Sequence, residues 1–215
     1  MTVTEGHAGA ASATFTVRLS RASAEAITVN YATADGTATG GDYQAASGTL
    51  TFAPGEVSKA VTVLVKGDRL GEANEAFAVN LSSPTNATLA DNQGVGTIVD
   101  DEPRITITDV SKKEGRKGQK ALFTFVVTLS AVYDQAVTLS FLTANGTAKT
   151  GDGDYIPKSG TLTFAPGETT KTVTIEVKGD GKREANETFY VDLFDLSSNA
   201  SFTKKRGAGT ILNDD

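Results

Sequence analysis

The sequence predicts an all-β chain made of two immunoglobulin-like antiparallel β-sandwiches in tandem, with about seven strands in each. Three observations support this prediction: the composition, a long internal repeat, and short segments in which apolar and polar residues alternate. Of the 215 residues, 22 are Gly, 39% are hydrophobic and 7% are aromatic. Together with abundant Thr and Val, this composition is typical of a β-rich fold with many turns.

The internal repeat divides the chain into two copies. Residues 47–56 (SGTLTFAPGE) recur unchanged as residues 159–168, and residues 72–75 (EANE) recur as residues 184–187. A period this long corresponds to whole domains rather than to the short units of a solenoid. We therefore expect one domain over residues 1–102 and a second over residues 103–215.

Alternating segments predict the strands of each copy. In the first copy the segments are residues 15–19, 27–31, 50–52, 61–65 and 77–81. Turn signals separate them, among them Asp35-Gly36 and Pro54-Gly55. The second copy has Asn145-Gly146 where the first has Asp35-Gly36, so the charge of Asp35 is dispensable and we expect a turn role for the pair.

The two copies differ at their beginnings. The second opens with residues 104–110 (RITITDV) before its Glu114-Gly115, whereas only four residues precede Glu5-Gly6 in the first. We therefore expect most of the first strand of domain 1 to be missing and the chain to be a fragment of a larger protein. Residues 100–103 (DDEP) join the copies and lack the Gly and Ser of a flexible tether.

Acidic residues are concentrated in loops next to the repeated motifs. The chain has 26 acidic and 20 basic residues and a formal net charge of −6. Fifteen of the acidic residues lie in these loops: Glu5, Asp42, Asp68, Glu72, Glu75, Asp100, Asp101 and Glu102 in the first copy, and Glu114, Asp154, Asp180, Glu184, Glu187, Asp214 and Asp215 in the second. Loops at alternate strand junctions meet at one end of a sandwich, so we expect each set to converge there.

Converging carboxylates need compensation. Two like charges about 5 Å apart repel by roughly 3 kcal/mol at an effective dielectric constant near 20. The cluster then destabilises the fold, raises the pKa of its members, or binds a cation. A hard divalent ion with roughly 6–8 oxygen ligands suits the cluster, and Ca²⁺ tolerates irregular loop geometry better than Mg²⁺. The alternative for Glu72 and Glu75 is a surface ion pair with Lys66 or Arg69.

Other site chemistries find little support. Cys is absent, which excludes disulfides and thiolate metal sites. The only His, His7, has no counterpart in the second copy, so no Ser-His pair or zinc set repeats, and we expect no enzyme. Acidic loops and the lack of a basic, aromatic face argue against nucleic-acid binding. No stretch approaches the roughly 18 apolar residues of a membrane span.

The ordered motifs resemble the Calx-beta domain over nearly the whole chain. In the first copy they are residues 33–38 (TADGTA), 41–43 (GDY), 48–52 (GTLTF), 54–56 (PGE), 72–77 (EANEAF) and 96–101 (GTIVDD), and the second copy matches at corresponding places. Members of this family are immunoglobulin-like sandwiches. They occur as calcium sensors in sodium–calcium exchangers and as repeats in extracellular adhesion and bacterial surface proteins.

The resemblance implies Ca²⁺-ligand roles for all fifteen loop carboxylates named above. It places Leu70 and Lys182 at positions where the family can use a backbone carbonyl as the Ca²⁺ ligand, so their side chains are expected to have no role. The exchanger domain has a longer acidic run in the loops of Asp68 and Asp180, so we expect fewer or weaker ions here. Asn213 begins the terminal run of the second copy and offers a neutral oxygen.

Together these observations predict a non-enzymatic, calcium-binding structural or adhesion module, a fragment of a larger extracellular or cell-surface protein. Residues 100–102 are both predicted ligands and the interdomain linker, so Ca²⁺ is expected to rigidify the joint. Expected partners are calcium ions, neighbouring domains of the parent protein, and a cell-surface protein or glycan.

Two alternatives to this function remain open. One is a metal-independent structural spacer. The other is a carbohydrate-binding module, although such sites usually need exposed aromatic residues. The chain has no Trp, and we expect Tyr43 and Tyr155 to pack in the core.

Overall fold

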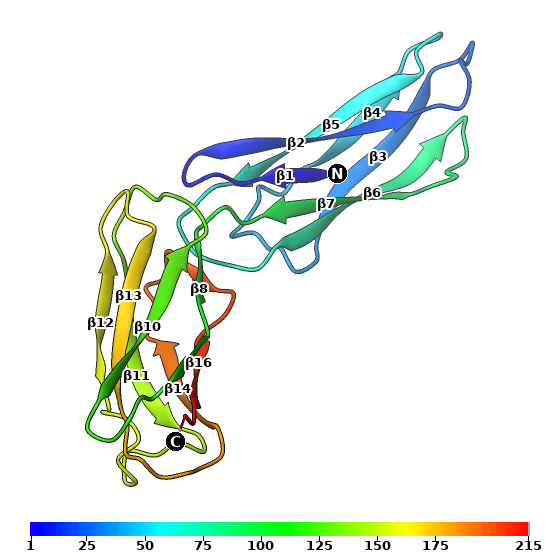
Figure 1. Cartoon of the computed structure of the whole chain (residues 1–215). Helices are drawn as coiled ribbons and strands as arrows, with labels where there is room; N and C mark the ends of the chain where they lie inside the picture. Colours follow the sequence, from blue (N-terminus) through cyan, green and yellow to red (C-terminus); the bar gives the residue numbers. More distant parts are fainter. Residues whose placement is uncertain (215) are drawn as a thin grey trace. The chain divides into compact units, whose positions relative to one another are not determined.

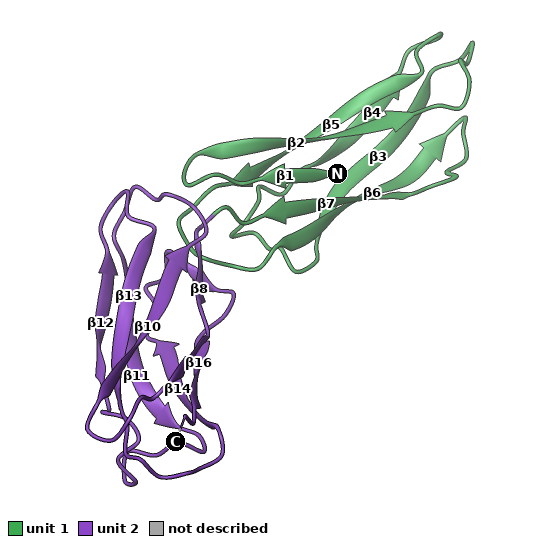
Figure 2. Cartoon of the chain, viewed as in Figure 1, with its two compact units in different colours: residues 1–101 green, residues 102–215 purple. Residues whose placement is uncertain are grey.

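The chain consists of β-strands joined by turns and loops in the residues that the structure describes, 1–214. The computed structural model divides into two units, residues 1–101 and 102–215 (Figure 2). This division lies one residue before the boundary that the repeat predicts. Each unit is a β-sandwich of two mainly antiparallel sheets, which confirms the predicted fold class (Figure 1).

Unit 1 contains a five-stranded and a two-stranded sheet. Its strands are β1 (Thr2–Thr4), β2 (Ala10–Arg18), β3 (Ile27–Asp35), β4 (Ser47–Phe52), β5 (Ser58–Lys66), β6 (Glu75–Thr85) and β7 (Gln93–Val99). The larger sheet has the order β1-β7-β6-β3-β4, and the smaller sheet pairs β2 with β5. The segments expected from alternation lie in β2 to β6, with only Leu19 outside a strand.

Unit 2 repeats this plan with two additional short strands. Its strands are β8 (Arg104–Ile107), β9 (Val110–Lys113), β10 (Lys120–Leu129), β11 (Val137–Asn145), β12 (Ser159–Phe164), β13 (Thr170–Lys178), β14 (Glu187–Phe194), β15 (Ser201–Phe202) and β16 (Arg206–Leu212). One sheet has the order β12-β11-β14-β16-β9, and the other has the order β13-β10-β8-β15.

The first strand of unit 2 is divided between the two sheets. β8 pairs antiparallel with β10, whereas β9 pairs parallel with β16. Asp109 lies at the crossing, and its Oδ1 accepts a hydrogen bond from the Ala208 N–H at 2.7 Å. That bond, together with the nearby Lys204 ammonium, lowers the pKa of Asp109. β1 of unit 1 corresponds to β9, but the described residues of unit 1 contain no counterpart of β8.

Stacked aromatic rings connect the two sheets of each unit. Tyr43 stacks on Phe77 with ring centroids 4.6 Å apart, and Tyr155 stacks on Phe189 at the same distance. All four side chains are at most 2% exposed, so the packing role expected for the two tyrosines is confirmed. Burial of these rings is a large contribution to the core, and their stacking adds about 0.5–1.5 kcal/mol per pair.

The tyrosine hydroxyls attach the loop after β3 and the loop after β11 to the sandwich. Tyr43 Oη donates to Asp35 Oδ1 at 2.6 Å, and Tyr155 Oη donates to Asn145 Oδ1 at 2.6 Å. The neutral Asn145 therefore accepts the same hydrogen bond as Asp35, in agreement with the expectation that the charge of Asp35 is dispensable. Asp42 and Asp154 directly precede the tyrosines, and their Oδ2 atoms accept hydrogen bonds at 2.7 Å from the N–H groups of Thr39 and Lys149.

Candidate metal site

The parallel pairing of the first and last strands places distant acidic residues side by side. Thr4 of β1 is opposite Val99 of β7, and the Glu5 N–H continues the ladder by donating to the Val99 carbonyl at 3.3 Å. Glu5 and Asp100 therefore leave the same edge of the sheet together. In unit 2 the Glu114 N–H donates to the Leu212 carbonyl at 3.3 Å in the same way.

The first group is Glu5 and Asp100 of unit 1 with Glu102 of the connection that follows. A carboxylate oxygen of each lies within 4.8 Å of the others. The three residues are 6%, 9% and 3% exposed. Acidic residues are rarely this buried unless they are paired or bind a metal. The group therefore has the donor chemistry and the shielding of a cation site.

The second group in unit 1 is Asp42, Glu72 and Glu75, again with ligand oxygens within 4.8 Å of one another. Burial, followed by the charge of Asp42, a hydrogen bond shared with it, and the charge of Glu72, raises the pKa of Glu75 to about 7. The Glu72 N–H donates to Asp100 Oδ1 at 2.7 Å, which connects this group to the first. Loops after β3, β5 and β7 thus converge at one end of the unit, as the sequence predicts.

Unit 2 repeats the second group as Asp154, Glu184 and Glu187. Burial, followed by the charge of Asp154, a hydrogen bond shared with it, and the charges of Glu184 and Asp152, raises the pKa of Glu187 to about 7. The two raised pKa values occur at the same position of the repeat. Each reflects burial first and then the negative charge of the neighbouring carboxylates.

A lysine enters the acidic loop of unit 2. Lys182 Nζ lies 2.7 Å from Asp180 Oδ2 and 4.0 Å from Glu184 Oε1, and this lowers the pKa of Asp180. The same contacts raise the pKa of Lys182. Unit 1 has Leu70 at this position. The expectation that the Lys182 side chain has no role is therefore wrong, because its ammonium partly neutralises the loop.

The terminal acidic runs also differ between the units. The Asp100 N–H donates to Asn74 Oδ1 at 3.3 Å, and the Asn213 N–H donates to Asn186 Oδ1 at 3.2 Å, so Asp100 and Asn213 are equivalent. Whereas Asp100 accepts a bond from a backbone N–H, Asn213 uses Nδ2 to donate to the Lys182 carbonyl at 3.1 Å. Unit 2 thus has one negative charge fewer at this position.

Glycine residues allow the early loop of each unit to reach the terminal run. The Gly6 N–H donates to Asp101 Oδ1 and the Gly115 N–H donates to Asp214 Oδ1, both at 3.1 Å. Gly6 has φ +79° and Gly115 has φ +87°, a region that residues with a side chain rarely adopt. The Glu-Gly pair in each copy is therefore a structural part of the site.

Several expected ligands lie outside these oxygen groups. Asp68 and Asp180 each accept a hydrogen bond at 2.7 Å from the N–H two residues later, so they form local turns. Glu114 is 8% exposed and Asp214 Oδ2 lies 3.8 Å from Lys113 Nζ, but neither belongs to a group of three among the described residues. Asp215 lies outside the described residues. The ligand roles of all fifteen carboxylates remain predictions.

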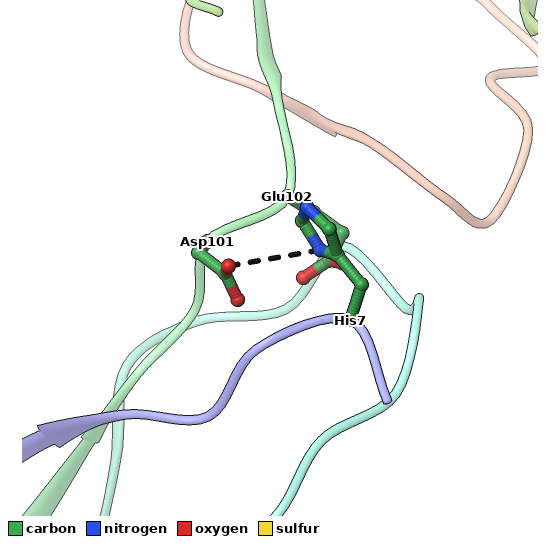
Figure 3. Close-up of side chains that lie close together, drawn as sticks. All are labelled: His7, Asp101 and Glu102. Atoms are coloured by element: carbon green, nitrogen blue, oxygen red, sulfur yellow. Dashed lines mark ion pairs between the residues drawn. The ribbon is translucent and has the colours of Figure 1, made fainter. Parts of the chain in front are cut away.

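His7 lies closer to the acidic run than the sequence indicates. Its Nδ1 is 3.6 Å from Asp101 Oδ2, and it forms a further group of three with Asp101 and Glu102 (Figure 3). The repeat gives no signal for this contact, because the second copy has Arg116 at the equivalent position. Only the proximity of His7 to Glu5 in the sequence could have suggested it.

The donor set determines which ions could bind. Apart from His7, the grouped atoms are carboxylate oxygens, carried by loops or by the first residue of a strand, and such atoms suit hard cations such as Ca²⁺. Burial together with raised acid pKa values means that a bound cation would relieve an existing repulsion. The residues of both units therefore fit a calcium ion.

Comparisons with known proteins show the family to which the chain is similar. The family model for the Calx-beta domain matches residues 1–110 and 99–215. The Adhesion G-protein coupled receptor V1 of Danio rerio is 30% identical over 147 residues, which cover 66% of this chain and 2% of that protein. Sodium/calcium exchanger 1 of Rattus norvegicus is 29% identical over 170 residues, covering 66% of this chain and 17% of the exchanger.

A third relative and one solved structure extend the comparison. The Extracellular matrix organizing protein FRAS1 of Mus musculus is 27% identical over 176 residues, covering 75% of this chain and 4% of that protein. The chain thus spans only 2% to 17% of the length of these three curated relatives. The crystal structure of CBD12 from CALX1.2 is 20% identical with a TM-score of 0.49, and the match covers 98% of this chain and 95% of that one.

No helix among the described residues is long and apolar enough to cross a membrane. The two matches to the family model follow each other along the chain and together cover all 215 residues. The chain therefore belongs to the Calx-beta family and carries two domains of that family in tandem.

Proposed function

We propose that both units bind Ca²⁺ through the carboxylates gathered at one end of each sandwich, and that this binding serves a structural role rather than catalysis. The observation that carries the proposal is the duplicated group Asp42/Glu72/Glu75 and Asp154/Glu184/Glu187, in which one glutamate of each unit has a pKa near 7. A calcium ion replaces the shared proton and turns a destabilising cluster into a stabilising one.

We propose that unit 1 binds Ca²⁺ more tightly than unit 2. Beside its repeated group, unit 1 has Glu5 and Asp100, which form a buried group with Glu102 of the connection. Unit 2 replaces Asp100 by Asn213 and has Lys182 against Asp180 and Glu184. A second candidate function follows for unit 2 alone: the ammonium of Lys182 favours a metal-independent spacer there.

A calcium-dependent role at the joint is also proposed. Residues 100–102 include two carboxylates of the first group and connect β7 to the following unit. An ion held by Glu5, Asp100 and Glu102 would restrict the backbone dihedral angles of this short connection. Calcium would then limit the range of orientations between neighbouring units, which suits a protein that bears load or spans a distance.

The relatives indicate a setting for such a module. Two of the matched proteins are named as an adhesion receptor and as an organiser of extracellular matrix. We propose that this tandem is part of a larger extracellular or cell-surface protein, where neighbouring domains and a cell-surface protein or glycan are its partners. The match to a sodium/calcium exchanger supports calcium as the ion but does not support an extracellular location.

The first test is calcium titration by calorimetry with melting curves in Ca²⁺ and in chelator. A free Ca²⁺ concentration of 100 times Kd is expected to stabilise the folded state by about 2.7 kcal/mol. Glu75→Gln is expected to weaken binding to unit 1 while leaving the calcium-free protein at pH 8 at least as stable as the parent, because a repelled charge is removed. Glu25→Gln, on the exposed surface, is the matched control. The proposal would be refuted if calorimetry shows no heat of binding and if the melting curves in Ca²⁺ and in chelator are identical.

The second test is pH dependence. In chelator, Glu75 and Glu187 keep protons in the folded state that the unfolded chain releases above pH 4.5, because burial and neighbouring carboxylates raise their pKa to about 7. Folding stability should therefore fall as pH rises from about 4.5 to about 7. In Ca²⁺ the affinity should instead increase with pH through 7, with proton release on binding. The double variant Glu75→Gln/Glu187→Gln should lose both the pH dependence of folding stability and the pH dependence of Ca²⁺ affinity. If both dependences remain, they do not arise from Glu75 and Glu187.

The third test exchanges the residues that distinguish the two loops. Lys182→Leu should raise the affinity of unit 2 for Ca²⁺ by roughly two- to tenfold, because it removes an exposed competing charge. Leu70→Lys should lower the affinity of unit 1 by a similar factor. Lys204→Leu removes an ammonium that pairs with Asp109, outside the oxygen groups, and serves as the charge-matched control. If all three variants bind Ca²⁺ with the affinity of the parent chain, Lys182 does not compete with the ion.

The fourth test addresses the joint by small-angle X-ray scattering of the tandem. Calcium is expected to narrow the distribution of distances within the molecule, because the connection between the units becomes part of a coordinated site. Asp100→Asn should remove this narrowing while unit 2 still binds calcium. A distribution that is the same with Ca²⁺ and with chelator, despite calorimetric binding at unit 1, would refute the role at the joint and leave the binding proposal intact.

A further inference from the structure

An imidazole nitrogen lies beside the terminal acidic run of unit 1. His7 is the only His of the chain, and its Nδ1 lies 3.6 Å from Asp101 Oδ2. Glu102 follows Asp101 directly in the chain, and one of its carboxylate oxygens completes a group whose ligand atoms lie within 4.8 Å of one another (Figure 3). The other groups of three among the described residues offer oxygen alone, whereas this group offers nitrogen and oxygen.

The carboxylate of Asp101 is oriented before any ion binds. The Gly6 N–H donates to its Oδ1 at 3.1 Å, so Oδ2 is the atom that faces the His7 ring. The side chains of His7 and Asp101 are 34% and 30% exposed, whereas Glu102 is 3% exposed. Two partly exposed ligands thus lie next to a buried one, and an ion could reach the group from solvent.

The turn that carries His7 is fixed by backbone contacts on both sides. Gly6 and Gly9 have φ of +79° and +81°, a region that residues with a side chain rarely adopt. The Gly67 N–H donates to the Gly9 carbonyl at 3.1 Å. A Cβ at Gly67 would lie only 2.1 Å from the Gly6 carbonyl oxygen, so the turn packs directly on this backbone. A metal ion would therefore bind here with little cost of ordering a loop.

Unit 2 has the same turn without a metal ligand in it. The Gly115 N–H donates to Asp214 Oδ1 at 3.1 Å, but Arg116 occupies the position of His7. Lys113 Nζ lies 3.8 Å from Asp214 Oδ2. The turn thus forms without an imidazole, and the guanidinium that replaces it cannot bind a cation. His7 therefore adds a nitrogen donor to a turn whose folding does not require one.

We propose that unit 1 has a site for a first-row transition-metal ion such as Zn²⁺, with His7 Nδ1, Asp101 Oδ2 and the Glu102 carboxylate as ligands. Imidazole nitrogen suits such ions, whereas Ca²⁺ prefers oxygen. Zinc–ligand bonds of about 2.0–2.2 Å place neighbouring ligand atoms of a tetrahedral site roughly 3.3–3.6 Å apart. The 3.6 Å between His7 and Asp101 is close to this spacing. Three protein ligands leave the fourth position to water.

Zinc and calcium would use this end of unit 1 differently. Glu102 belongs to the group with His7 and also to the group with Glu5 and Asp100. The His7 ring belongs only to the first of these two groups. Replacing the ring is therefore expected to remove zinc binding and to keep calcium binding, so that the two metals can be tested separately.

The experiment titrates Zn²⁺ into the metal-free tandem, which carries no added His, in calcium-free buffer by calorimetry and nitrogen NMR of the imidazole. Because His7 is the only His, the ring signals have a single source. One equivalent of Zn²⁺ is expected to shift the Nδ1 signal. His7→Gln should lower the affinity of the tightest zinc site at least about tenfold, since losing even an outer-shell partner of a metal ligand costs about 10–100-fold.

Two further variants serve as controls. His7→Arg introduces the residue that the same turn accepts in unit 2, and it should lower zinc affinity as His7→Gln does. Glu25→Gln removes an exposed carboxylate outside the groups of three and should bind zinc as the parent does. Calcium titration of His7→Gln is expected to match that of the parent.

Three outcomes would overturn the proposal. If one equivalent of Zn²⁺ leaves the Nδ1 signal unchanged, the ring is not a ligand. If both His7 variants bind zinc as the parent does, the contact with Asp101 is an ion pair only. If His7→Gln loses zinc and calcium in equal measure, the ring only positions the carboxylates. A shifted Nδ1 signal together with loss of zinc binding in both variants would support the site, whether or not the parent binds calcium.

Discussion

The arrangement of each unit depends on the parallel pairing between its first and last strands. β1 with β7, and β9 with β16, place residues about a hundred positions apart in the sequence at one sheet edge. The chain leaves that edge with Glu5 beside Asp100, and with Glu114 beside the terminal run of unit 2. Without this pairing Glu5 and Asp100 would not lie side by side, and the buried group that they form with Glu102 would not exist.

Much of the fold could be predicted because the alternation of apolar and polar residues is a local signal and the long repeat marks two whole domains. Strand segments, turn residues and the packing of Tyr43 follow from patterns within a few residues of one another. The division of the first strand of unit 2 was not predicted: Asp109 interrupts the alternation of residues 104–110, but the interruption does not show that the two halves pair with different sheets. Asp109 determines that point through bonds to Ala208 and Lys204, which are about a hundred residues away.

The sequence predicts which carboxylates surround the candidate site, but not which of their oxygens lie close to one another. Repetition identifies the carboxylates, and sandwich topology indicates that they meet. Which oxygens approach one another depends on loop conformation, so Asp68 forms a local turn whereas Glu72 joins a group. His7 and Lys182 were missed for a common reason: each occurs in one copy only, and a search for what is repeated discards the differences through which the two sites diverge.

The buried tyrosines have a practical consequence. The chain has no Trp, so its near-ultraviolet emission comes from its five Tyr residues. Tyr43 and Tyr155 each follow an acidic residue of a repeated group and lie against an aromatic ring in the core. Replacing one of them by Phe keeps the ring and removes one chromophore. The emission that is lost relative to the parent then belongs to one known ring, in unit 1 for Tyr43→Phe and in unit 2 for Tyr155→Phe. The difference between parent and variant therefore reports on one half of the tandem without any attached dye.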